Sequence, residues 1–313
     1  MILSKIKNLQ KLIDDNDLES IKNHLTTAQK PKSGQKHPRS YLMLSAHNLK
    51  HLKKIPQLHS DAIMLNLEDG VAKEQKPMAL HLAMLAIQNA TAKENIIVRI
   101  NSLEEGGEDE IKQLCKVKPD AIRVPKIYNT TQVKRALSLI DEDIELHLSI
   151  ETKEAFDQIS ALKLSKRVTT FYLGILDLYA DLKLSQETIA LNNSTVHYIL
   201  SKFLNDCKIA GVNAVGFTYQ KHKDLEGFKK WCELEKLMGY ESKSCISPKQ
   251  VAIANEAFTT QNEIERAKRV VKLFEQNYKR GITGFDDVQL GFIDEPIYKD
   301  ACNILKQRAI YEK

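Results

Sequence analysis

The sequence is poor in the features that mark secreted, membrane-spanning or zinc-binding proteins. Its five cysteines are scattered over 313 residues and never form a Cys-x-x-Cys pair, so the sequence indicates neither a disulfide framework nor a zinc site. No apolar run reaches the roughly 18 residues of a membrane span, and the N-terminus lacks the long apolar stretch of a signal peptide. We therefore expect a cytoplasmic protein with reduced thiols and no membrane association.

Aromatic residues and clustered positive charge are also scarce. Aromatics make up 6% of the residues, and the net charge of +5 is not concentrated in a block of consecutive Lys and Arg. Nucleic-acid binding needs a basic face with base-stacking side chains, so this composition disfavours it. The mild positive excess suits a polyanionic small molecule such as coenzyme A but identifies no partner by itself.

The N-terminal segment has the apolar spacing of helices, followed by a polar break. Asp17 is placed to cap a second helical segment that runs to Leu25, and Lys30–Gln35 interrupts the pattern. We expect residues 1–36 to form a helical extension and linker that covers the outside of the main domain; a partner-binding element is the alternative. The helical spacing is carried by Ile2, Leu3, Ile6, Leu9, Leu12 and Ile13.

From Ser40 onward, short apolar runs alternate with longer segments of helical period. Apolar strands separated by helices predict a parallel sheet that is buried on both faces. About eight repeats suit a closed barrel better than an open doubly wound sheet, so we predict an α/β fold with a (β/α)8 TIM barrel over residues 37–280. The predicted strands are Tyr41–Leu44, Ala62–Leu67, Ile96–Ile100, Ala121–Val124, Leu146–Ile150, Thr170–Leu173, Ala214–Phe217 and Ser244–Ile246.

The C-terminal part changes character after two further helical segments, Val251–Phe258 and Glu263–Tyr278. Glycines and a proline between 281 and 296 mark an irregular excursion. A last helix is predicted over Tyr298–Leu305. We treat residues 281–313 as a separate C-terminal segment.

Polar side chains directly follow several of the predicted strands. In a parallel barrel these positions gather on one rim, where the active sites of this fold lie. Carboxylates crowded together repel one another unless a cation or a shared proton compensates, and two cationic side chains do not suffice for four carboxylates. The residues expected at the rim are Glu68, Asp69, Arg99, Lys126, Glu151 and Asp177.

A bound divalent metal would compensate this excess of negative charge. The candidate ligands are carboxylates without a cluster of His or Cys, which favours Mg²⁺ or Mn²⁺ over Zn²⁺. Two protein carboxylates would leave coordination positions for water and for oxygens of a substrate.

Motifs that follow one another from Arg39 to Leu305 resemble those of the citrate lyase β-subunit, malyl-coenzyme A lyase and related aldolases. Each motif is short, and the ordered series carries the resemblance. The stretch D-A-I-M-L-N-L-E-D-G-V from Asp61 to Val71 resembles the family's D-A-V-I-L-D-L-E-D-A-V. Further matches are Arg39-Ser40, Val98-Arg99-Ile100-Asn101, Val124-Pro125-Lys126, Ile150-Glu151-Thr152, Leu173-Gly174-Ile175-Leu176-Asp177-Leu178 and Ile293-Asp294-Glu295-Pro296.

The resemblance implies roles for the rim residues. Glu151 and Asp177 would hold Mg²⁺, or Mn²⁺ in its place. Arg99 would clamp a substrate carboxylate, and Glu68 with Asp69 would orient Arg99 and bound water.

The resemblance also implies contacts beyond the rim. By position, Arg39, Lys76 and Lys126 would contact coenzyme A. Residues 281–313 would reach the active site of a neighbouring subunit, where Asp294 would handle a proton. This implies a homo-oligomer, either a trimer or a hexamer.

The implied reaction is Mg²⁺-dependent cleavage or formation of a carbon–carbon bond next to a carbonyl, through an enolate. The substrate would be a 3-hydroxyacyl-coenzyme A or a related oxo-acid adduct. A metal polarises the oxo group, and a carboxylate near the substrate can move the proton. The chain would thus be an oxo-acid lyase.

Several positions depart from the family pattern and leave alternatives open. Ser45-Ala46 stand where Pro-Gly is usual, Asn66 replaces an Asp, Leu80 an Arg, and Ser247 a His. The proposed metal ligands are kept, so the departures put the coenzyme A site and the substrate in question. The alternatives are a metal-dependent oxo-acid aldolase that uses no coenzyme A, and a barrel that serves as a non-catalytic subunit.

Overall fold

The computed structural model describes residues 8–34, 37–259 and 261–309 and contains a closed barrel of eight parallel strands. Each strand pairs with the next, and β1 pairs with both β2 and β8, which closes the barrel. The predicted TIM barrel is confirmed, and each predicted strand bound lies within two residues of the observed one. The strands are β1 (Ser40–Ser45), β2 (Ala62–Asn66), β3 (Ile96–Arg99), β4 (Ala121–Val124), β5 (Glu145–Ile150), β6 (Val168–Leu173), β7 (Asn213–Gly216) and β8 (Ser242–Cys245).

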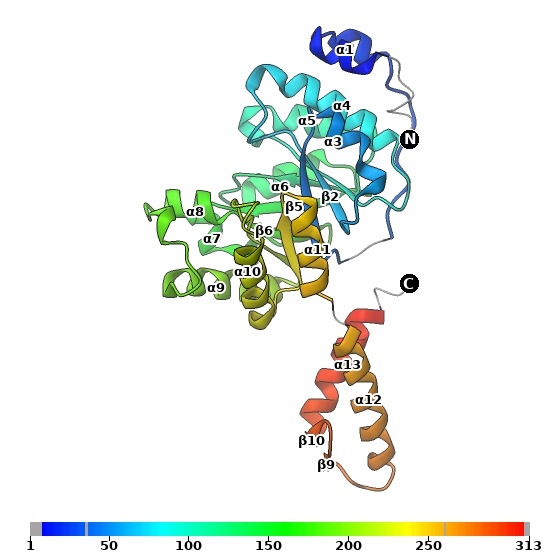
Figure 1. Cartoon of the computed structure of the whole chain (residues 1–313), viewed down its shortest axis with the longest axis vertical. Coiled ribbons are helices and arrows are strands. Elements are labelled where there is room, and N and C mark those ends of the chain that lie inside the picture. Colours follow the sequence, from blue (N-terminus) through cyan, green and yellow to red (C-terminus); the bar gives the residue numbers. More distant parts are fainter. Residues whose placement is uncertain (1–7, 35–36, 260, 310–313) are drawn as a thin grey trace. The chain divides into compact units, whose positions relative to one another are not determined.

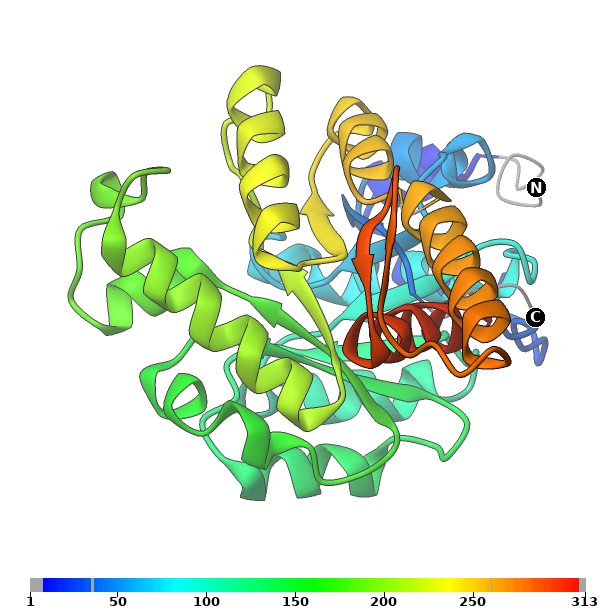
Figure 2. The ribbon, with the colours of Figure 1, turned by 90° about the horizontal axis from the view of Figure 1, so that it is seen from below.

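Helices connect the strands and surround the barrel, as Figures 1 and 2 show. Several begin at a side-chain cap; Asn129, for example, accepts hydrogen bonds from the backbone N–H groups of Thr131 and Gln132 at the start of α6. The helices of the barrel are α3 (Leu49–Lys53), α4 (Lys76–Gln88), α5 (Gly107–Leu114), α6 (Thr130–Leu139), α7 (Lys153–Asp157), α8 (Ile175–Asp181), α9 (Ser194–Ala210), α10 (Leu225–Met238) and α11 (Pro248–Ala257).

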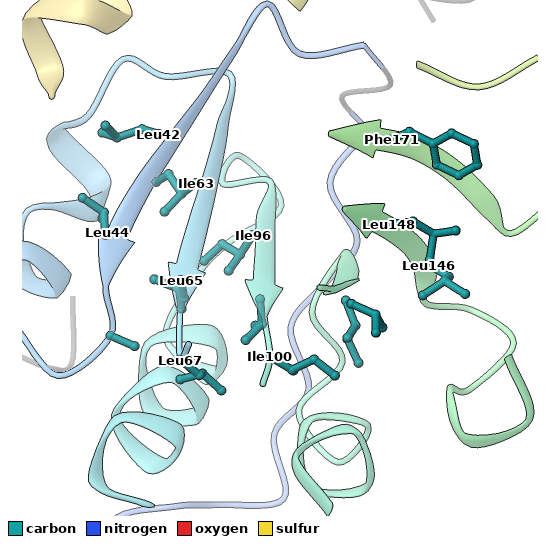
Figure 3. Packing of buried hydrophobic residues seen from close by; sticks show 14 of the residues in the cluster. Leu42, Leu44, Ile63, Leu65, Leu67, Ile96, Ile100, Leu146, Leu148 and Phe171 are labelled. Carbon is teal, nitrogen blue, oxygen red and sulfur yellow. The ribbon is translucent and has the colours of Figure 1, made fainter. Parts of the chain in front are cut away.

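The strands carry two separate cores because successive side chains point to opposite faces. The outer core fills the space between strands and helices, and Figure 3 shows part of it on neighbouring strands, with Leu42, Ile63 and Ile96. The inner core lies inside the barrel and includes Tyr41, Met64, Ile97, Tyr172 and Val215.

The N-terminal helices α1 (Leu9–Asp14) and α2 (Leu18–Lys22) join the outer core through Leu9 and Ile21, and α2 contacts α4. The predicted cover is therefore present for the described residues; Ile2, Leu3 and Ile6 lie outside them. The segment predicted as a linker differs. Lys30 is buried, and its Nζ lies 2.6 Å from Asp120 Oδ2, so an ion pair fixes this segment to the barrel.

The C-terminal part forms a compact unit that begins at Thr259. It contains α12 (Gln261–Tyr278), the antiparallel pair β9 (Phe285–Asp287) and β10 (Gly291–Ile293), and α13 (Glu295–Ala309). From the sequence, we placed the boundary between the barrel and the C-terminal segment at residue 280. The boundary lies earlier because α12 belongs to the C-terminal unit: its apolar face, with Val270 and Phe274, packs with Ile293 and Ala301. The irregular excursion contains the β9–β10 pair. In the part of the chain described, every helix is too short or too polar to cross a membrane.

Candidate active site

Residues on or just after all eight strands of the barrel line a cavity of about 270 Å³ at the carboxyl end. Five charged side chains that line it come from different strands, so the closed barrel brings together residues far apart in the sequence. They are Asp69, Arg99, Arg123, Glu151 and Asp177. Four of these five were expected at the rim.

Tight backbone turns aim these side chains. Gly70 after β2 has φ +81°, and Lys126 after β4 has φ +51°, a left-handed conformation that glycine adopts easily and lysine does not. Gly174 follows β6 where a Cβ would lie 2.6 Å from Glu151 Cβ. Only glycine therefore allows the β6–α8 turn to pass so close to the Glu151 side chain.

Arg99 is held by an ion-pair network. Its Nη1 lies 3.1 Å from Glu68 Oε2 and 3.8 Å from Asp69 Oδ2, and Lys126 Nζ lies 3.3 Å from Glu68 Oε1. Asn66 Oδ1 accepts hydrogen bonds from Arg99 Nε at 2.7 Å and from the backbone N–H of Glu68 at 3.1 Å. The amide at position 66 thus orients Arg99 without adding another negative charge.

The carboxylates of the cavity lack full compensation. Burial raises the pKa of Glu151 to about 7, against the opposing effect of Arg123. Burial and then Asp69 raise the pKa of Asp177, and burial raises the pKa of Glu68. The two buried Glu68 carboxylate oxygens face the cations of Arg99 and Lys126, at 3.1 and 3.3 Å. A positive charge in this cavity would stabilise all three ionised groups.

Glu151 and Asp177 fit a hard divalent cation. Both line the cavity, and Glu151 Oε1 accepts a 2.6 Å hydrogen bond from the backbone N–H of Lys126, which fixes the carboxylate. Within residues 8–34, 37–259 and 261–309, no three His, Cys, Asp or Glu side chains are arranged to hold a metal. A metal between these two carboxylates would take its remaining ligands from water and substrate, as Mg²⁺ often does.

Three predicted site residues lie away from this cavity: Arg39, Lys76 and Asp294. Arg39 precedes β1 at the opposite end of the barrel, where its Nε and Nη2 pair with the two Asp61 oxygens at 2.7 and 3.0 Å. We therefore withdraw Arg39 from the expected coenzyme contacts. Lys76 donates to Asn101 Oδ1 in a separate cavity of about 380 Å³ beside α4.

Asp294 belongs to the C-terminal unit and caps α13. Its Oδ1 accepts a 3.1 Å hydrogen bond from the backbone N–H of Ile297. This cap gives Asp294 a structural role, and a chemical role would be additional.

Sequence reasoning missed Arg123 and the polar residues next to it on the neighbouring strands. Arg123 lies on the inner face of β4, and its Nε donates to Ser149 Oγ at 2.9 Å. On the neighbouring strand β5, His147 is the register partner of Arg123, and its Nδ1 lies 3.0 Å from Tyr172 Oη. The available signal was a charged residue inside an otherwise apolar four-residue strand, which is costly unless a partner or a ligand compensates the charge.

Comparisons with known proteins test the family and the fold of this chain. Residues 39–248 match the model of the HpcH/HpaI aldolase/citrate lyase family. A (3S)-malyl-CoA thioesterase of Cereibacter sphaeroides is 31% identical over 253 residues, covering 79% of this chain and 87% of the relative. The citrate lyase subunit beta of Haemophilus influenzae is 27% identical over 285 residues, with 87% and 96% covered.

A solved structure supports the fold. The protein CitE of Mycobacterium tuberculosis, crystallised with magnesium, acetoacetate and coenzyme A, superposes with a TM-score of 0.70 at 19% identity, covering 88% of this chain and 99% of that one. The resemblance drawn from the motifs is thus confirmed, and with it the expectation of a carbon–carbon lyase at the level of the family. The chain belongs to the HpcH/HpaI aldolase/citrate lyase family.

Proposed function

We propose that this protein is a Mg²⁺-dependent carbon–carbon lyase or synthase that acts on a 3-hydroxyacyl-coenzyme A or a related oxo-acid adduct. The observation that carries the proposal is the pair of under-compensated carboxylates, Glu151 and Asp177, which share one cavity with Arg99. Mn²⁺ would fit the same ligands. The cytoplasmic location stays a prediction from the sequence.

The residues of the cavity would divide the work. Arg99 presents a planar guanidinium that can bind a carboxylate through two hydrogen bonds, and Glu68 with Asn66 holds it in place. The metal would supply Lewis-acid stabilisation of negative charge that develops on the oxo oxygen. Lys126 is half-exposed at the rim, where it pairs with Glu68, and it would leave this pair to reach the anionic part of a thioester substrate.

Isothermal titration tests the metal site and the ligand class together. Mg²⁺ is titrated first, followed by pyruvate, glyoxylate or oxaloacetate, with and without acetyl- or propionyl-coenzyme A. We expect metal-dependent binding of an oxo acid and a thioester, abolished in Glu151→Gln. The matched control is Glu154→Gln, because Glu154 is exposed three residues further along the chain. Undiminished Mg²⁺ binding by Glu151→Gln would contradict the assignment.

The same titrations separate the alternatives. Oxo-acid binding without any thioester effect favours an aldolase that uses no coenzyme A, and no binding favours a non-catalytic subunit. The similarity to a malyl-CoA thioesterase favours thioester hydrolysis as a second candidate activity. Release of free thiol from malyl-coenzyme A, without formation of acetyl-coenzyme A, would identify it.

We also propose that the C-terminal unit completes the site of a neighbouring subunit in a homotrimer or homohexamer, with Asp294 moving a proton. Asn caps helices as well as Asp does, so Asp294→Asn keeps the start of α13 and removes only the acid. Glu151→Gln and Asp294→Asn subunits, each inactive alone, are mixed during refolding. A site is intact only when its barrel comes from an Asp294→Asn subunit and its C-terminal unit from a Glu151→Gln subunit. Random assembly should therefore restore about a quarter of the wild-type activity. Analytical ultracentrifugation gives the assembly, and a mixture that stays inactive contradicts sharing.

A further inference from the structure

Arg123 is a buried cation fixed at the inner wall of the cavity. Its side chain lies on β4 with 4% of the residue exposed, and it lines the same cavity as Glu151 and Asp177. Ser149 Oγ accepts from Nε at 2.9 Å, and the guanidinium carbon lies 4.1 Å from the centre of the Tyr172 ring. These two contacts fix the plane of the guanidinium and leave the Nη edge to meet other groups.

Arg123 has no carboxylate partner among the described residues, in contrast to Arg99. No Asp or Glu oxygen of the described chain lies within ion-pair distance of it, and its Nη1 contacts the sulfur of Met64 at 3.3 Å. A thioether is a weak acceptor. Burial, and next the charge of Arg99, lower the pKa of Arg123 to about 10, so the group is still charged at neutral pH.

The register of the barrel places the two arginines side by side. Arg99 on β3 is the direct partner of Arg123 on β4, and both line the cavity. Like charges on directly opposed strand positions destabilise a sheet. Glu68 lies within ion-pair distance of Arg99 and Lys126, and no ion pair joins it to Arg123, so the arrangement retains one cation that an anionic ligand in the cavity would pair.

We propose that Arg123 binds a second carboxylate of the substrate and selects 2-oxo acids that carry two carboxylates over those that carry one. This inference rests on the proposed function, in which the metal and Arg99 engage the oxo-acid end. Arg123 would then hold the far carboxylate by a charge-assisted, two-pronged hydrogen bond. Its alternative role is to act as a counter-charge for Glu151, without contact with substrate.

The test compares oxaloacetate with pyruvate in the presence of Mg²⁺, by isothermal titration on the wild type, Arg123→Met and Arg123→Lys. Met keeps much of the length and removes the charge, while Lys keeps the charge and loses the fork. We expect Arg123→Met to weaken oxaloacetate binding by about 10-fold or more and pyruvate binding by less than about 2-fold, with Arg123→Lys between. Circular dichroism shows whether each variant is folded. If Arg123→Met does not fold, the affinities of Arg123→Lys for the two acids are compared with those of the wild type instead.

Two results would overturn the proposal. In the first, Arg123→Met loses affinity equally for oxaloacetate and pyruvate and its Mg²⁺ affinity changes, which indicates that Arg123 is a counter-charge for Glu151. In the second, the preference for oxaloacetate over pyruvate is the same in the variant as in the wild type. If the wild type binds neither oxo acid with Mg²⁺, the proposed function fails, and succinate against propionate without metal then tests Arg123 alone. Succinate binding that is lost in Arg123→Met supports the second-carboxylate role. Absence of succinate binding by the wild type overturns it.

Discussion

The two ends of the barrel carry the same kinds of charged side chains in different states. At the amino end, Lys30 pairs with Asp120 at 2.6 Å, and Arg39 makes two hydrogen bonds with Asp61. At the carboxyl end, Glu68 pairs with Arg99 and Lys126. Among the described residues, however, no cation lies within ion-pair distance of Glu151 or Asp177, and no carboxylate lies within that distance of Arg123. Ions at the amino end therefore have their partners within the protein, whereas those at the carboxyl end lack part of theirs.

This difference separates stability from chemistry within one fold. Fully paired charges at the amino end hold the N-terminal segment and the first strands in place. Under-compensated charges at the carboxyl end raise the free energy of the folded protein, and binding of the proposed metal and substrate would offset this cost. Substitutions at the two ends should accordingly affect different measurements.

The largest effect is expected for Glu151→Gln at the carboxyl end. Loss of a proposed metal ligand should lower kcat/KM by about 1,000-fold, equivalent to ~4 kcal/mol. The melting temperature should stay equal or rise, because a buried carboxylate with a pKa of about 7 is replaced by a neutral amide. Steady-state kinetics and calorimetry measure both. A stable variant with wild-type turnover would contradict the comparison.

Asp120→Ala at the amino end should do the reverse. Asp120 pairs with Lys30 and accepts from the backbone N–H groups of Ser33 and Ile96, both at 2.8 Å. Its loss leaves the buried Lys30 uncompensated, which costs about 3 kcal/mol of unfolding free energy. Urea denaturation measures this loss. The kcat/KM of the folded variant should stay within about 2-fold of the wild type, and a larger fall would mean that the two ends are coupled.

Much of the fold was accessible from the sequence because its strands are short apolar runs with clear helical spacing between them. All eight strands were predicted, and Ala121–Val124 has the predicted bounds. The domain boundary was misplaced because the pattern of α12 shows an apolar face without showing what covers it. That face packs on α13, a contact that depends on tertiary structure.

The candidate site was partly accessible for a similar reason. Residues directly after the strands, such as Glu151 and Asp177, can be placed on a rim once the barrel is assumed. Arg39 was assigned to coenzyme A by a motif match alone, although its position before the predicted strand Tyr41–Leu44 already indicates the amino end of a parallel barrel. Arg123 carried a signal in the sequence, a charge inside an apolar strand, but its lack of an ion-pair partner among the described residues shows only in the packed barrel.

A matched pair of Arg→Lys substitutions sharpens the comparison at a smaller scale. Arg99→Lys should lower kcat/KM by about 10- to 100-fold, because Lys cannot present the planar fork to a carboxylate. Arg39→Lys removes the same fork from Asp61 at the other end and should leave kcat/KM unchanged. Steady-state kinetics measures kcat/KM for both variants. Undiminished turnover in Arg99→Lys would rule out the proposed role of Arg99 as a clamp for the substrate carboxylate.

The smallest effect concerns His147, which lies inside the barrel between the two ends. Its Nδ1 contacts Tyr172 Oη at 3.0 Å and its Nε2 lies 3.4 Å from Glu145 Oε2. Burial lowers the pKa of His147 below its ordinary value of 6.5, against the opposing effect of Glu145. The unfolded chain therefore binds a proton at this residue more readily than the folded chain does.

Stability should consequently fall as the pH drops below about 6.5, by at most ~1.4 kcal/mol per pH unit from this residue. Urea denaturation at pH 7.5, 6.5 and 5.5 should show about 1 kcal/mol more loss in the wild type than in His147→Gln, which cannot take up the proton. Glu145 does not mask the effect, because its pKa of about 2 keeps it ionised throughout this range. Parallel pH curves for the two proteins would mean that His147 gains as much from Glu145 as it loses by burial, and the interior of the barrel would then resemble the well-paired amino end.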